Sequence, residues 1–491
     1  MSNKNSLEKI FIILFAFALV YQIFIPPVVG LADNGDFARI IDKVGIYTTQ
    51  DTQFMGNINL TYNISPKFML KGYQSSELIF VYTSILLNSL LSKDGQFYVL
   101  ILASVHIIAF LVCLWLIAKG LNGIQPSRWI IYLCIFVFFS DVGYVAYLNS
   151  IYSEPASIIF LALTLGVIFM ILKNALQGEV DLAWLFAFFA ASFLFVIAKP
   201  QNAAMGVFLA YLGLRFFTLL HVKKISPKRA RLFGWILSAG LIVFSFLFFA
   251  FGLPKYYRSG DLWNSIFMEI VGRSENPAQA LQELGLPAEM IQYKGTHAFS
   301  EGVNRNVYED FQHSWLYFKV LKYYVIHPGQ LFSLIDETTK MAFELQPENL
   351  GNFTISLGSY TKSKAFAVWN DLRVALLPKS IWTLIGLLLV NLGVILVKIK
   401  KFDRTIPARL ISETHLVILL MAVFQYLTVI MAEGTFELIK HMFLFNLLLD
   451  VTLVFMIAYL VSAFSLFKPW KYLKVQNWRP GRPAKPADLT Q

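Results

Sequence analysis

Leu31-Ala32-Asp33-Asn34-Gly35-Asp36-Phe37-Ala38-Arg39 directly follows an apolar run over residues 10–29. That run is about twenty residues long, which is enough to cross a bilayer. Two carboxylates, an amide and a glycine therefore stand where the first membrane span ends. Charge so close to hydrocarbon is costly and usually functional. We expect Asp33 and Asp36 to form a working site, while the same spacing also suits Asp33 as a helix cap and Asp36 as the partner in a capping box.

Composition places the chain among multi-pass membrane proteins. Of its 491 residues, 57% are hydrophobic and 14% are charged, a balance typical of polytopic membrane chains. Cys113 and Cys134 both lie in apolar runs, which favours buried thiols over a disulfide or a cysteine metal site. The net charge of +11 is divided among short loops, which predicts membrane orientation and no nucleic-acid partner.

The apolar runs predict about ten spans of the length that a bilayer requires. The first, 10–29, is longer than the apolar core of a signal peptide and follows a weakly basic segment, so we expect an uncleaved anchor. The run 77–92 is shorter than a span, and we expect an interfacial half-helix there. The other expected spans are 97–118, 129–148, 155–172, 182–198, 203–220, 232–253, 381–397, 410–431 and 442–467.

Positive charge sets the expected topology. If 77–92 does not cross and the N-terminus is cytoplasmic, the basic loops 223–231 and 398–409 and the tail 468–491 all face the cytoplasm. That distribution satisfies the positive-inside rule, and a crossing at 77–92 would violate it. We therefore expect both termini to be cytoplasmic.

These spans predict an all-α polytopic membrane protein with a small extracytoplasmic helical cap. Residues 1–253 form the N-terminal transmembrane domain, which includes a first extracytoplasmic loop over 31–96. The cap covers 254–380, with helices expected at 277–284, 315–326 and 330–343. The C-terminal transmembrane helices cover 381–467, and a basic cytoplasmic tail covers 468–491.

This topology brings four polar groups to the outer face: residues 33–39 with Glu77, the loop 149–155, the hairpin 199–202 and the connection 433–441. Simpler interpretations exist: Glu154 also suits a helix start, Lys199 suits a snorkelling lysine, and Glu437 shares a helix face with Lys440 and His441 and can pair with them. His106, in mid-span, is expected to be a hydrogen-bonded packing residue. The candidate substrate-binding residues beside Asp33 and Asp36 are Asn34, Arg39, Glu77, Tyr152, Glu154, Lys199, Gln201, Asn202, Glu433, Glu437, Lys440 and His441.

Sugar transfer from a lipid-phosphate donor needs the kinds of side chain that this face supplies. Asp33 or Asp36 can serve as the base that deprotonates an acceptor hydroxyl. The phosphate needs cations, which Arg39, Lys199, Lys440 and His441 can supply. The two first-loop acids can instead hold a divalent cation, Mg²⁺ or Mn²⁺, and the sequence leaves both arrangements open.

The order of these motifs resembles the membrane glycosyltransferases of the GT-C fold. The matching segments are Asp33-Asn34-Gly35-Asp36, the half-helix, Ser153-Glu154-Pro155, Lys199-Pro200 and the stretch 440–446 (Lys-His-Met-Phe-Leu-Phe-Asn). Within that fold, the Asp-Asn-Gly-Asp-Phe motif with this late stretch resembles the bacterial WsfD-type glycan-biosynthesis hexosyltransferases.

The resemblance implies a polyprenyl-phosphate-linked sugar donor and an extracytoplasmic glycan or lipid-linked acceptor. It also implies catalysis by the first-loop acids at the outer face of a bacterial cytoplasmic (inner) membrane. The chain departs from the mannosyltransferase branch, which carries a Glu-Ala-Arg-like turn and an Arg-Tyr pair, because it has Glu154-Pro155-Ala156 and Lys440-His441 instead. The sugar is therefore left open.

Other classes of function are consistent with parts of the sequence. A lipid-linked glycan polymerase would use a similar outer site but transfer whole repeat units, and a polysaccharide flippase or transporter would perform no chemistry. A transporter is expected to carry charges near the bilayer midplane, whereas these spans look nearly uncharged and Arg215 lies close to an inner end, where it can snorkel. In a non-enzymatic scaffold, the outer acids would only cap helices.

Overall fold

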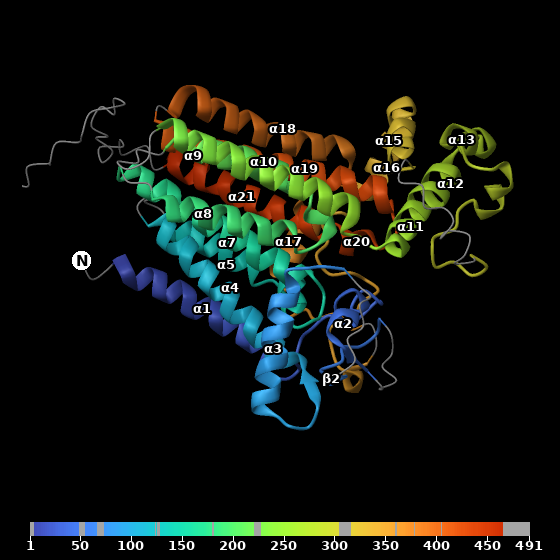
Figure 1. Ribbon diagram of the computed structural model, residues 1–491, viewed down its shortest axis with the longest axis horizontal. Helices are drawn as coiled ribbons and strands as arrows, with labels where there is room; N and C mark the ends of the chain where they lie inside the picture. The colour runs from blue at the N-terminus through green and yellow to red at the C-terminus, as the bar shows by residue number, and fades with distance from the viewer. Residues whose placement is uncertain are drawn as a thin grey trace, which may run out of the picture.

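The computed structural model describes residues 4–48, 55–65, 73–122, 124, 128–178, 181–219, 227–303, 316–358, 361–377, 379–403 and 405–464. Long helices run side by side along the molecule, and the N-terminus lies at one end of this bundle (Figure 1). The short helices α2, α11 and α13 lie at the opposite end (Figure 1). The expected basic tail and residues 223–226 of the expected basic loop lie outside the described residues.

Within the described ranges the elements are mostly helices, and the three short strands lie between residues 46 and 98. The first part contains α1 (Lys4–Phe24), α2 (Ala38–Val44), β1 (Ile46–Tyr47), β2 (Thr61–Ile64), α3 (Glu77–Leu91), β3 (Gln96–Tyr98), α4 (Val99–Leu121), α5 (Arg128–Phe139), α6 (Val142–Leu148), α7 (Glu154–Leu176), α8 (Leu182–Val196), η1 (Pro200–Asn202), α9 (Met205–Phe217) and α10 (Pro227–Phe251). The second part contains α11 (Lys255–Trp263), η2 (Asn264–Ile270), α12 (Val271–Arg273), α13 (Pro277–Leu284), η3 (Ala288–Tyr293), α15 (Leu316–Ile326), α16 (Pro328–Thr339), η4 (Ile355–Leu357), α17 (Val368–Leu376), α18 (Ile381–Val397), η5 (Lys398–Phe402), α19 (Ile406–Glu433), α20 (Leu438–His441) and α21 (Phe443–Phe464).

Among the described residues, seven helices are long and apolar enough to cross a membrane, or eight if the bent pair α5–α6 is one span. The seven include α1, α4, α7, α10, α18 with η5, α19 and α21. Two of the expected spans, α8 and α9, have only 15 and 13 residues. Both lie alongside the long helices (Figure 1). The multi-pass prediction is thus supported, while the count of ten is not confirmed.

The expected single span over 129–148 is wrong as a continuous helix. It is bent by 68° between α5 and α6. Asp141 stands at the bend, where its Oδ1 accepts from the Gly143 amide at 2.9 Å and its Oδ2 accepts from the Asn370 amide at 2.9 Å. The carboxylate caps the start of α6 and also binds the backbone of Asn370. These two bonds stabilise a new helix start at this position instead of a continuous helix.

The all-α prediction missed a small sheet. β1, β2 and β3 form a three-stranded antiparallel sheet, with Ile46 opposite Ile64 and Tyr62 opposite Phe97. Each strand has two to four residues, which is too short for an alternating pattern to be recognised in sequence. The sheet ties the first loop to the start of α4.

α3 agrees with the expected half-helix. It has 15 residues and lies across the end of the bundle at a steep angle to α1 and α4 (Figure 1). Ser75 and Ser76 anchor its N-terminal end by donating to the carbonyls of Ala198 and Leu194, at 2.5 and 2.8 Å. One side exposes large apolar side chains such as Leu86 and Leu90, as an interfacial helix requires.

The segment between α10 and α18 is helical, as expected. α13 matches the expected 277–284 helix, α15 starts at Leu316, and α16 covers Pro328–Thr339 instead of 330–343. Pro328 opens α16 because its fixed φ suits the first helical turn. The division of the chain into domains remains a prediction.

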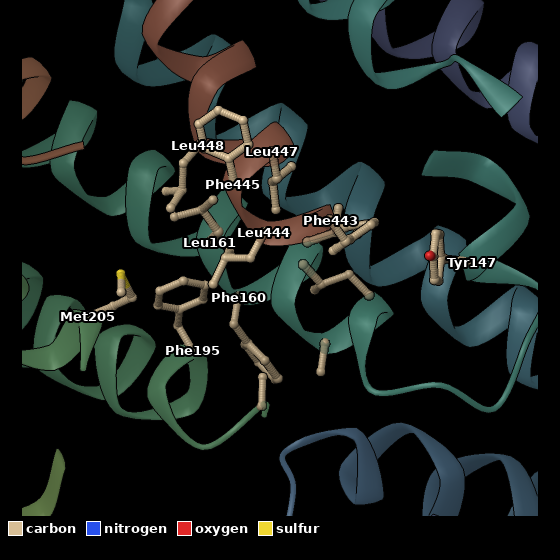
Figure 2. Close-up of a cluster of buried hydrophobic side chains, with 14 of the residues drawn as sticks. Tyr147, Phe160, Leu161, Phe195, Met205, Phe443, Leu444, Phe445, Leu447 and Leu448 are labelled. Atoms are coloured by element: carbon tan, nitrogen blue, oxygen red, sulfur yellow. The ribbon is translucent and has the colours of Figure 1, made fainter. Parts of the chain in front are cut away.

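The buried core reaches to the end of the bundle that carries the polar motifs. Phe443 and Leu444 at the start of α21 lie near Phe160 of α7 and Phe195 of α8 (Figure 2). The rings of Phe443 and Tyr147 are 4.5 Å apart. Because α20 immediately precedes α21, this packing fixes the position of the polar residues on α20.

Candidate functional site

Asp33 is held in one orientation by its own loop. Its Oδ1 accepts from the backbone amides of Gly35 at 2.7 Å and Phe37 at 3.1 Å. Gly35 has φ +100°, a conformation that glycine adopts without strain. No described residue donates a hydrogen bond to Oδ2 of Asp33. The carboxylate is therefore fixed by one oxygen while the other remains available.

Asp36 is neutralised by two cations. Arg39 Nη2 lies 2.8 Å from its Oδ1, and Lys440 of α20 donates to its Oδ2. The expected capping box with Asp33 is wrong, because the Asp36 carboxylate points to these cations instead.

The two first-loop acids have opposite pKa shifts. Burial raises the pKa of Asp33, and the amides of Phe37 and Gly35 offset this only in part. Burial also acts to raise the pKa of Asp36, but Arg39 and Lys440 outweigh it and hold that pKa well below its usual range. Asp33 therefore accepts a proton more readily than Asp36.

Asn34 joins the first loop to the α19–α21 connection. Its Nδ2 donates to Glu437 Oε2 at 2.7 Å, and its Oδ1 accepts from Lys440 Nζ at 2.8 Å. Glu437 also accepts from Asn349 at 2.8 Å. The expected pairing of Glu437 with Lys440 is wrong, since each of them contacts the first loop separately.

Tyr152 supports this junction from the loop before α7. Its hydroxyl donates to the Ala32 carbonyl at 2.7 Å and accepts from the Asn34 amide at 3.2 Å. The Lys440 ammonium lies 4.9 Å from the centre of its ring, within the range of a cation–π interaction.

Glu154 and Lys199 form a second buried ion pair. Lys199 Nζ lies 2.7 Å from Glu154 Oε1, and both residues are less than 9% exposed. Burial acts to lower the pKa of Lys199, but Glu154 outweighs it, so this pKa is raised. Lys199 also helps to lower the pKa of Asp36, which shows that the two ion pairs share one electrostatic environment. A snorkelling lysine does not describe this position.

The η1 turn after Lys199 carries the next two predicted residues. Gln201 Nε2 donates to the backbone carbonyl of His441 at 3.1 Å. Asn202 Nδ2 donates to Ser157 Oγ at 2.9 Å and to the Phe195 carbonyl at 3.0 Å. Burial lowers the pKa of His441, which favours a neutral imidazole near pH 7.

Glu77 lies apart from this cluster. It is fully buried, with Oε1 2.8 Å from His106 Nε2 and Oε2 accepting from the Ala156 amide at 3.1 Å. His106 also bonds the Leu148 carbonyl at 2.9 Å, which confirms the expected packing role. Both oxygens of Glu77 are occupied, so its visible function is to cap α7 and thereby position Glu154.

Glu433 contacts the cap segment. It accepts from Asn264 Nδ2 at 3.1 Å and is hydrogen-bonded with Asp261 of α11. Burial, followed by the neighbouring Glu433, raises the pKa of Asp261 well above its usual value. Arg39 stacks on Tyr257, also of α11, at 4.7 Å from the ring centre. The sequence did not indicate Tyr257 or Asp261, because neither stands in a motif.

The following helix turn, η2, grips the same connection. Ser265 Oγ donates to the Met431 carbonyl at 2.6 Å. Glu269 accepts from the backbone amide and the hydroxyl of Thr435, each at 2.7 Å. η2 thereby holds the turn that leads to Glu437 and Lys440.

A separate buried charge pair fastens α17 to α21. Arg373 forms an ion pair with Asp450, and both side chains are fully buried. Asp450 Oδ2 also accepts from Tyr144 at 2.7 Å and from Trp369 at 2.9 Å. The expectation of nearly uncharged span interiors is therefore wrong. Arg215 does not simply snorkel either, because it pairs with Glu413 of α19 through two bonds of 2.7 and 3.0 Å.

The cluster at the end of the bundle contains fixed carboxylates, the buried cations Lys199 and Lys440, and the half-buried Arg39, which lies over Tyr257 of the cap. Among the described residues, no three of the His, Cys, Asp and Glu side chains gather as metal ligands, and the divalent cation remains an untested prediction. Arg39 Nε is buried without a hydrogen-bond partner among the described residues. It is therefore available to an anionic ligand.

Comparison with known families assigns most of the chain. The family model described as the YfdI N-terminal transmembrane domain matches residues 1–477. Neither the curated proteins nor the solved structures provide a match. The match extends from before α1 to beyond α21, which agrees with a multi-pass membrane protein. The chain belongs to the YfdI N-terminal transmembrane domain family.

Proposed function

We propose that the chain is a GT-C-like glycosyltransferase that moves a hexose from a polyprenyl-phosphate donor to an extracytoplasmic glycan or lipid-linked acceptor. The observation that carries the proposal is Asp33, a carboxylate with one oxygen fixed, one oxygen available and a raised pKa. It lies beside the ion pair between Asp36 and Lys440. Family membership is compatible with this class of enzyme.

Asp33 serves as the general base. Its free oxygen takes the proton of the acceptor hydroxyl while the hydroxyl oxygen bonds to the anomeric carbon of the sugar. The bond between the anomeric carbon and the phosphate oxygen breaks, and the electron pair leaves with the polyprenyl phosphate. Asp36 is less suited to the base role, because its cations keep it ionised and weakly basic.

Arg39, Lys199 and Lys440 receive the leaving phosphate. Arg39 still has a free buried Nε, while Lys199 and Lys440 are paired with Glu154 and Asp36. A phosphate group can share these cations because charge-assisted hydrogen bonds to phosphate resemble those to carboxylate. The acids keep the cations in place until the donor binds.

The membrane setting of the proposal follows from the bundle. The site lies at the end away from the N-terminus (Figure 1), and we place that end outside the bacterial inner membrane with both termini in the cytoplasm. α3 and the cap segment border the site there. They are the elements available to guide the lipid chain and the acceptor.

Purified protein in lipid nanodiscs, offered a panel of polyprenyl-phosphate hexoses, tests the proposal. Wild type is expected to release polyprenyl phosphate from one donor, and Asp33→Asn to release it about 10²–10⁴-fold more slowly. Asp94→Asn is the matched control, since Asp94 is an exposed acid of the same expected loop. Turnover by Asp33→Asn at the wild-type rate would refute the base assignment.

A second panel, of preassembled lipid-linked repeat units, separates the alternative functions. Transfer only of preassembled lipid-linked repeat units would identify a polymerase. Movement of a lipid-linked glycan across the membrane without release of polyprenyl phosphate would identify a flippase and overturn the enzyme proposal.

A further inference from the structure

The bundle contains an apolar cavity distant from the candidate site. It has a volume of about 170 Å³ and lies between α4, α5, α7, α19 and α21. Its walls include Leu114, Ile135, Leu165 and Val454. Along α21 the lining extends from Leu447 to Ser462, a rise of about 22 Å in a helix. This length exceeds half of a hydrocarbon core of ~30 Å, the depth available to one acyl chain.

The polar lining of the cavity gathers at one end. Lys398, Asp403, Tyr459 and Ser462 line it there. This end is opposite the candidate site, because α18 starts at the cap, where the Ile381 amide donates to Asp336 at 2.9 Å, and reaches Lys398 only after its whole length. At the other end, the lining of the cavity along α21 stops at Leu447, one turn after the start of that helix at Phe443.

At this polar end of the cavity, which we call the mouth, Asp403 has a carboxylate oxygen without a hydrogen-bond donor. Its side chain is 5% exposed, and its Oδ2 has no hydrogen-bond partner among the described residues. Lys398 Nζ lies 3.9 Å from the other oxygen, Oδ1, which is too far for a hydrogen bond. The same ammonium lies 4.3 Å from the centre of the Tyr459 ring. A buried carboxylate oxygen without a donor is energetically costly. A ligand that donates a hydrogen bond to this oxygen would therefore be favoured at the mouth.

We propose that this cavity binds one acyl chain of an aminophospholipid, whose ammonium donates to Asp403 and whose phosphate accepts from Lys398. The headgroup then matches both charges, and the chain matches the apolar walls. A choline headgroup has no N–H to donate. A glycerol headgroup offers Asp403 only neutral hydroxyl donors, which bind a carboxylate more weakly than an ammonium does. Polyprenyl phosphate brings no cation for Asp403. The site lies in the leaflet opposite the candidate active site and does not depend on sugar transfer.

Photolabelling tests the proposal on the full chain in nanodiscs. The probes are phosphatidylethanolamine, phosphatidylcholine and phosphatidylglycerol, each with the same diazirine-bearing acyl chain, and labelled peptides are mapped by mass spectrometry. We expect the ethanolamine probe to label the cavity peptides around Leu165 and Val454 about tenfold more than the other two, as one hydrogen bond to a charged group predicts. Equal labelling by all three probes would overturn the proposal.

Variants assign the preference to residues. Asp403→Asn is expected to bring the ethanolamine and choline probes to equal labelling. Lys400→Gln is the control, because Lys400 belongs to the same η5 turn, is exposed and does not line the cavity. It should leave the preference unchanged, and loss of the preference in Lys400→Gln to the same extent would overturn the assignment to Asp403.

A competition experiment uses the wild-type protein and therefore does not depend on whether a variant folds. Unlabelled phosphatidylethanolamine should remove the cavity label, while the label on Ile108, which is 64% exposed on the outer side of α4, should persist. Removal of the cavity label by polyprenyl phosphate instead would assign the cavity to that lipid and overturn the proposal.

Discussion

Asn34 and Glu437 are joined by a hydrogen bond of 2.7 Å, although 403 residues separate them in the chain. Glu437 has φ +43°, a left-handed conformation that a non-glycine residue adopts only when its surroundings compensate for the strain. The bonds from Asn34 and Asn349 supply that compensation. The first loop and the α19–α20 turn therefore form one structural unit.

The two first-loop acids should differ on amide substitution. Asp33→Asn keeps an oxygen for the amides of Gly35 and Phe37, so we expect an unchanged Tm and a loss of about 10²–10⁴-fold in kcat, as removal of a general base predicts. Asp36→Asn leaves Lys440 and Arg39 without their carboxylate and should cost about 3 kcal/mol of stability as well. Thermal unfolding in nanodiscs and donor turnover measure both. An equal fall in Tm for the two variants would contradict this distinction.

Activity should disappear in acid before the fold does. Asp33 must be ionised to act as a base, and its pKa is raised by burial. As the pH is lowered, kcat should therefore begin to fall while the pH is still above the usual aspartate pKa of about 3.9. The lowered pKa of Asp36 gives stability that is present above that usual value and is lost only as pH falls through the lower folded pKa. Profiles of kcat and Tm against pH should separate accordingly. A coincident loss of both would show that acid acts through the fold.

The Glu154–Lys199 pair should show strong coupling in a double-mutant cycle. Either Glu154→Gln or Lys199→Met alone leaves a buried charge unpaired and should lower stability by about 3 kcal/mol. The double variant should be more stable than the sum of the single losses predicts. Unfolding in detergent measures the cycle, with Lys173→Met as a control lysine whose described contact is a carbonyl on an exposed surface. Additive losses would mean that the pair is screened.

Arg373 should fasten the cap segment to the bundle. Arg373→Met removes the ion pair with Asp450 and should increase cleavage of the 340–380 segment in limited proteolysis while leaving the bundle intact. Asp450→Asn should act in the same direction. Arg258→Met is a suitable control, since Arg258 contacts carbonyls at the end of α10 and has no described ion pair. Equal protection of all variants would show that apolar packing alone holds α17.

Topology can be measured by cysteine labelling from outside intact cells. In a Cys113→Ser, Cys134→Ser background, Asp94→Cys should react with a membrane-impermeant maleimide, because Asp94 is exposed near the expected outer end. Lys400→Cys, exposed at the opposite end, should react only after the membrane is opened. The reverse pattern would invert the orientation.

Local sequence predicted the polar stretches well but not their partners. The acidic stretch at 33–39 and the charges at 154, 199 and 440 stand out because charge beside a span is rare. Glu77 satisfied the same criterion, but its burial against His106 depends on tertiary packing that no local pattern encodes. Asp450 was missed for a related reason, since its partner Arg373 is 77 residues away.

Helix ends and short elements were also beyond local prediction. The bend at Asp141 arises from a bond to Asn370, 229 residues later. Asp261 and Tyr257 belong to an amphipathic helix whose polar side would normally face water, and only the fold shows that this side covers Arg39. Such positions become visible only when distant segments are placed together.

The ion pair between Asp36 and Lys440 also limits how early the site can form during biosynthesis. The two residues lie 404 positions apart, so a ribosome adding about 5–20 residues per second completes the distance in roughly 20–80 s. Arg39 is the first counter-ion available to Asp36, because it lies only three residues away in the chain. The first loop must therefore wait for the last helices to be inserted, and a chain that stops before α20 cannot assemble the site.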